Sequence, residues 1–108
     1  MDKIHHPTLA AGRWKTLTFC EQMGNIGSEI SRATKAPTRE RCERAVDRAL
    51  ELLDLTIANE RGLRQRELLR VRELIADVFF GGMEYGETFE SLLPFFDAFA
   101  IVAREHRA

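Results

Sequence analysis

The sequence has no apolar run as long as the roughly 20 residues that a membrane-spanning helix needs. Its first 14 residues, MDKIHHPTLAAGRW, also lack the apolar centre of a signal peptide. We therefore expect a cytoplasmic protein that does not enter a membrane. The 108 residues are 44% hydrophobic and 31% charged, which is typical of a folded chain and predicts a single domain over residues 1–108.

Cysteine and histidine are scarce, with two and three residues respectively. Cys20 and Cys42 fall at apolar positions of two helical patterns, so we interpret both as reduced packing residues. A metal site would need more ligands, and the chain contains no phosphate-binding loop, no GxSxG motif and no zinc-ligand spacing. The sequence thus predicts no metal, no cofactor and no catalytic residues.

Two patterns come near to known helical enzymes. Glu40 with Glu43, and Glu51 with Asp54, have the ExxE and ExxD spacing by which all-α nucleotide pyrophosphohydrolases hold magnesium. Both pairs lie in one helical stretch and are interleaved with arginines, so ion pairs within the helix are the better interpretation. His106 has neither the Glu three residues earlier that a di-iron bundle needs nor the preceding Arg of helical-bundle RNases. An enzyme is therefore the least favoured class.

The basic residues are mostly arginine, which accounts for thirteen of sixteen, and they are unevenly placed. Residues 32–72 have a net charge of +4, and residues 73–108 have −5. Arginine favours bidentate partners such as carboxylate or phosphate, although a high-GC genome also enriches it. The candidate contacts to a nucleic-acid backbone are Arg41, Arg44, Arg48, Arg66 and Arg70.

The clearest secondary-structure signal is an amphipathic helix over residues 38–57. Thr38 follows a proline and can cap the first turn. Apolar residues then recur at intervals of three and four and form a stripe too wide for a single partner helix. We therefore expect the rest of the chain to be arranged around this segment.

Helical spacing also predicts helices over residues 14–35 and 63–80, and a last helix that begins at Thr88. Pro94 predicts either a kink or a fresh start of that helix. Short connections between four helices favour an all-α fold, an antiparallel up-down-up-down four-helix bundle, with residues 1–12 as a flexible arm. The predicted core includes Met23, Ile30, Val46, Leu53, Leu74, Val78, Phe96 and Phe99.

Gly24 and Gly27 place a seam of small residues near the middle of the predicted helix over 14–35. Each costs about 1 kcal/mol relative to alanine in a helix, so the pair needs a reason. One interpretation is a groove that another helix or a ligand approaches closely. The other is intimate packing within the bundle.

Phe95 and Ile101 fall outside the core stripe of the last helix and predict an oligomer interface. The turn at residues 36–37 and the loop around residue 82 should share one end of the bundle, which would place a basic cluster beside Glu84, Glu87 and Glu90. Opposite charges side by side suit a head-to-tail contact that closes into a ring, whereas a face-to-face dimer would bring like charges together.

Three blocks carry a resemblance to known proteins: residues 19–33 (FCEQMGNIGSEISRA), 45–57 (AVDRALELLDLTI) and 66–85 (RELLRVRELIADVFFGGMEY). They resemble a group of small, mostly uncharacterised bacterial proteins. More distantly, the chain is similar to proteins encoded in intervening sequences of 23S ribosomal RNA and to accessory proteins of diversity-generating retroelements. The resemblance implies four-helix bundles assembled as pentameric rings and, for the retroelement members, binding of nucleic acid and a reverse transcriptase.

The functional hypotheses follow in order. The first is a non-enzymatic, self-associating interaction or scaffold protein. The second is an accessory protein that binds RNA or DNA and partners a reverse transcriptase, although the slightly acidic net charge of −1 differs from that class. The third is an enzyme.

Overall fold

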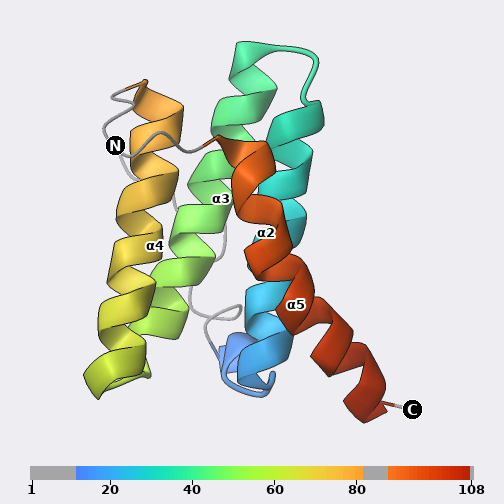
Figure 1. Ribbon diagram of the computed structural model, residues 1–108, viewed down its shortest axis with the longest axis vertical. Helices are drawn as coiled ribbons and strands as arrows, with labels where there is room; N and C mark the ends of the chain where they lie inside the picture. Colours follow the sequence, from blue (N-terminus) through green and yellow to red (C-terminus); the bar gives the residue numbers. More distant parts are fainter. Residues whose placement is uncertain (1–11, 82–87, 108) are drawn as a thin grey trace.

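The computed structural model describes residues 12–81 and 88–107, with side chains described as far as residue 105, and these ranges are helical apart from short turns. Consecutive helices run in opposite directions (Figure 1). A helical turn at residues 12–14 precedes four long helices. These are α2 (Phe19–Lys35), α3 (Arg39–Ala58), α4 (Gly62–Phe80) and α5 (Phe89–Arg107). The all-α prediction is confirmed. Of the predicted arm over 1–12, all but residue 12 lies outside the described residues.

Local capping fixes where the helices begin. Thr38 caps α3 as predicted, since its hydroxyl accepts the Arg41 N–H at 3.1 Å. The predicted start of the first long helix at Trp14 is wrong. Thr18 and Glu21 instead form a reciprocal capping box, with bonds of 2.8 and 3.1 Å between side chains and backbone amides, so α2 begins at Phe19.

The last helix begins as expected, because the Thr88 hydroxyl accepts the Ser91 N–H at 3.0 Å. Pro94 lies inside a single helix, so no separate helix starts there. α4 ends at Gly81, whose φ of 74° is a left-handed conformation that glycine adopts without a steric cost. Both predicted boundaries are therefore confirmed, and the fresh start at Pro94 is not.

The helices pack in the spatial order α4, α3, α2, α5, while α4 and α5 make few contacts with each other (Figure 1). The sequence placed residues 38–57 at the centre, but α2 shares that position, because it packs along both α3 and α5. The reason lies in its glycines. A Cβ on Gly27 would lie 2.5 Å from the Phe96 Cβ, and one on Gly24 would lie 3.4 Å from Ala100, so the seam serves close packing of α2 on α5.

One core cluster joins the four helices. Five predicted core residues are no more than 2% exposed: Met23, Ile30, Val46, Leu53 and Phe96. The other three predicted members are partly buried and pack against the cluster: Leu74, Val78 and Phe99. Ile26 and Ile75 are fully buried as well, although the sequence-based core omitted the first. No described helix is both long and apolar enough to cross a membrane.

α3 and α4 are joined by polar contacts at two heights. Arg72 donates to both carboxylate oxygens of Asp54, at 2.7 and 3.3 Å, and this hydrogen bonding raises the pKa of Arg72 above its ordinary value. Near the other end, the Arg39 guanidinium lies 4.2 Å from the centre of the Phe79 ring and donates to the Phe79 carbonyl at 3.1 Å. The expected pairing of Asp54 within its own helix is therefore wrong.

A buried polar network attaches the segment before α2 to the core. The Trp14 indole N–H donates to the Thr56 hydroxyl at 2.9 Å, and that hydroxyl donates to Gln22 Oε1 at 3.0 Å. The Gln22 amide in turn donates to the Trp14 carbonyl at 3.0 Å. Thr56 is fully buried, so each of these groups depends on the network for its hydrogen bonds.

Thr56→Val should lower the free energy of unfolding by about 1–3 kcal/mol, because valine fills the same space but leaves the Trp14 N–H and Gln22 Oε1 buried without that partner. Urea unfolding followed by circular dichroism measures the loss, and Trp14 fluorescence reports on the segment itself. Thr34→Val is a control, since the Thr34 hydroxyl bonds only a carbonyl of its own helix. Equal stability of Thr56→Val and the parent would show that the network contributes nothing.

Candidate functional site

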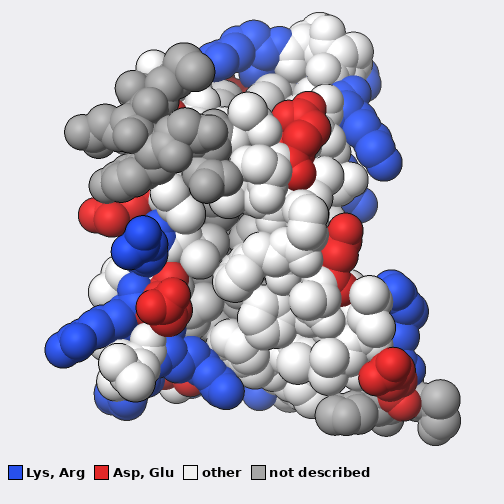
Figure 2. Space-filling model, in the orientation of Figure 1, with Lys and Arg blue, Asp and Glu red and all other residues white. Residues whose placement is uncertain are grey.

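The most strongly charged hollow of the described surface lies between the last turns of α2 and the first half of α3. We call it the basic pocket. It has a volume of about 440 Å³ and is lined by Ser31, Arg32, Lys35, Ala36, Pro37, Arg41, Arg44, Ala45 and Arg48. Basic surface gathers at the same end of the molecule in Figure 2, at the upper right. Five cationic side chains thus surround a floor of two alanines and a proline.

Helix geometry explains how α3 supplies three of these cations. Arg41, Arg44 and Arg48 follow one another at intervals of three and four, so they lie on one face of the helix. Pro37 ends the connection from α2 and Thr38 caps α3, which brings the end of one helix beside the start of the next. The pocket also lies beside the N-terminus of α3, where the helix dipole favours an anion.

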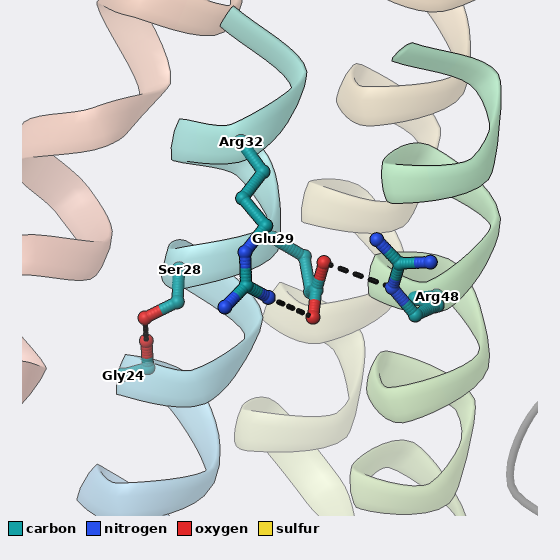
Figure 3. A network of polar contacts seen from close by, with 5 residues as sticks. All are labelled: Gly24, Ser28, Glu29, Arg32 and Arg48. Atoms are coloured by element: carbon teal, nitrogen blue, oxygen red, sulfur yellow. Dashed lines mark hydrogen bonds and ion pairs between the residues drawn. The ribbon is translucent and has the colours of Figure 1, made fainter. Parts of the chain in front are cut away.

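Glu29 is the acidic residue that contacts the basic pocket, and it is only 8% exposed. Its carboxylate accepts from Arg32 Nη1 at 2.8 Å and from Arg48 Nε at 3.1 Å. The two arginines approach it from different helices, as Figure 3 shows. Glu29 therefore ties α3 to α2 and fixes the direction of two of the five cations.

The other three cations, Lys35, Arg41 and Arg44, form no ion pair with any residue in the described ranges. All three are exposed at their own positions. Their positive charges face the hollow without a local counter-charge, so the pocket is suited to binding an anion.

The structure separates the arginines predicted to contact a nucleic-acid backbone. Arg41, Arg44 and Arg48 line the basic pocket, whereas Arg66 and Arg70 are exposed on α4 and do not line it. The five arginines therefore do not form one site. Sequence reasoning placed Arg32 and Lys35 at the same end of the bundle but left them out of the candidate site; the short connection around Pro37 was the available signal.

A second feature is apolar. The outer face of α5 exposes Phe95, Ile101 and Val102, with exposed fractions of 42%, 48% and 36%. Figure 2 shows that few charges interrupt the surface along this helix. The predicted outward orientation of Phe95 and Ile101 is confirmed. The two are six residues apart, however, which places them roughly 120° apart around the helix, so they do not form one compact patch.

Phe95 instead lies beside a groove between α4 and α5, which we call the aromatic groove. The groove has a volume of about 330 Å³ and is lined by Phe19, Leu63, Arg64, Glu67, Leu68, Phe95 and Phe99. Phe99 packs edge-to-face against Phe19 and Phe95, with ring centres 5.5 and 5.2 Å apart. The Arg64 guanidinium lies 4.2 Å from the centre of the Phe19 ring. Leu63, at the edge of this groove, is 77% exposed.

Within the described ranges, no three His, Cys, Asp or Glu residues are grouped so that they could hold a metal ion. Both cysteines are free and half-buried. The predicted acidic neighbours Glu84 and Glu87 lie outside the described residues. No family model, curated protein or solved structure matches the chain. The two surface features must therefore be interpreted from their own chemistry.

Proposed function

We propose that the chain is an antiparallel four-helix bundle that acts as a non-enzymatic interaction protein and associates with a second copy of itself through the outer face of α5. The observation that supports this proposal is the apolar character of α5 on two sides. Leu92, Phe96 and Ala103 are buried in the bundle, while Phe95 and Val102 are exposed. A helix with apolar residues on a second side exposes surface that association can bury.

The exposed side has the spacing of a helix–helix contact. Ser91, Phe95, Ala98 and Val102 follow at intervals of four, three and four, and none is charged. A second copy of the same stripe can therefore pack on it without placing like charges in its centre. The alternative, a head-to-tail ring, would place the basic pocket of one copy against the acids of α5 on the next. Both arrangements bury Phe95, and the measured mass separates a dimer from a larger ring.

Phe95→Glu should therefore dissociate the assembly, because it places an unpaired charge in the apolar centre of the contact only when two copies meet. Sedimentation at tens of micromolar and physiological salt measures the mass, and circular dichroism checks that helicity is retained. The matched control is Leu69→Glu, which changes an exposed leucine on α4 that does not line the aromatic groove. We expect that control to keep the assembled mass. A parent protein that sediments at 12.4 kDa would contradict the proposal.

A further inference from the structure

The basic pocket has no role in the core or in the proposed self-association through α5. Three of its cations lack a partner among the described residues, and the α3 N-terminus adds a partial positive charge beside them. Concentrating like charges in a hollow raises the free energy of the folded protein unless a counter-charge binds there. The ligand that this arrangement fits is therefore an anion that brings more than one negative charge.

The shape of the pocket narrows the class of anion. Arg41 to Arg48 spans seven residues, or roughly 10 Å along α3, and Lys35 faces the same hollow from α2. A single carboxylate or phosphate can contact only part of that length. Guanidinium groups bind phosphate oxygens bidentately, and a lysine adds a point charge that adjusts to the ligand. A short chain of linked phosphates meets these requirements within about 440 Å³.

We propose that the basic pocket binds an oligophosphate anion, with Arg41, Arg44 and Lys35 as its direct contacts. Glu29 sets the strength of that binding. It holds Arg32 and Arg48 by hydrogen bonds of 2.8 and 3.1 Å and so withholds part of their charge from the pocket. The oligophosphate is either free or the phosphate chain of a nucleotide, since both present the same linked groups.

The first experiment is calorimetric titration with inorganic triphosphate at low salt. Arg44→Ala should weaken binding at least about tenfold, because it removes a charged hydrogen-bond donor worth roughly 1.5–3 kcal/mol. The matched control is Arg66→Ala, which removes the same charge from α4, outside the pocket, and should change affinity by less than about twofold. Equal weakening by both variants would show diffuse surface attraction and overturn the proposal.

Glu29→Gln provides a test of opposite sign. It removes one negative charge and frees Arg48, so triphosphate should bind several-fold more tightly while circular dichroism shows that the helices remain. Unchanged or weaker binding in a folded Glu29→Gln protein would contradict the role of Glu29. ATP in place of triphosphate separates the two sources: tighter binding of ATP indicates a nucleotide, and equal binding indicates the phosphate chain alone.

The same titrations are made on the Phe95→Glu protein, so that a pocket covered in an assembly is not mistaken for an absent site. Failure of triphosphate to bind either protein would overturn the proposal, whether or not self-association occurs. A single-stranded oligonucleotide supplies the last comparison. If it binds with steep salt dependence while triphosphate does not, the arginines serve an extended nucleic-acid backbone and the oligophosphate site is wrong.

Discussion

Gly27→Leu is expected to lower the free energy of unfolding by about 3 kcal/mol, the upper end of ordinary overpacking. Even the first side-chain carbon would lie 2.5 Å from the Phe96 Cβ, a distance at which one of the two helices must move. Phe96 is 1% exposed and cannot turn aside without leaving the core. The remaining leucine atoms would force α5 away from α2 along their contact.

Gly24→Ala is the matched control for this change. Its Cβ would lie 3.4 Å from Ala100, which is ordinary contact, so the gain in helix propensity should stabilise the protein by about 0.5–1 kcal/mol. Urea unfolding followed by circular dichroism measures both variants. A Gly27→Leu protein as stable as the parent would mean that α5 does not approach α2 at this glycine.

Leu53→Ala should cost about 2–5 kcal/mol of unfolding free energy, through lost transfer energy and the cavity that remains. Leu53 is fully buried on α3, the helix with neighbours on two sides, so little can collapse into the space. Thermal and urea unfolding measure the loss. Leu69→Ala, at a position that is 47% exposed, should stay within about 0.5 kcal/mol of the parent. Similar losses for the two leucines would indicate that Leu53 is not in the core.

Features written in local sequence could be predicted. The interval of three and four residues identified the helices, the Thr38 and Thr88 hydroxyls marked two of their starts, and five core residues followed from the same spacing. The wrong start of the first long helix also had a local signal. Thr18 and Glu21 have capping-box spacing, and Trp14 looked like part of the apolar stripe although it is buried through a network with Thr56.

Features that depend on which helices meet could not be predicted. Helical spacing gives each helix an apolar face but does not say which neighbour covers it, so the shared central position of α2 was missed. For the same reason the five arginines looked like one set until α3 and α4 were placed. Phe95 and Ile101 were both expected on the surface, and only the angle between them around α5 shows that they face different ways.

The close contact between Gly27 and Phe96 also has a consequence for the order in which the protein can fold during synthesis. The two residues are 69 positions apart, so the glycine seam of α2 is made early and its partner late. α2 and α3 can pair as soon as residue 58 has left the ribosome, but the side of α2 that α5 covers stays open to water until most of the last helix has emerged. Ile26 and Ile30 lie on this same central helix, so the nascent chain is most prone to wrong association in that interval, and bringing α5 back to α2 is the most distant closure that the chain makes.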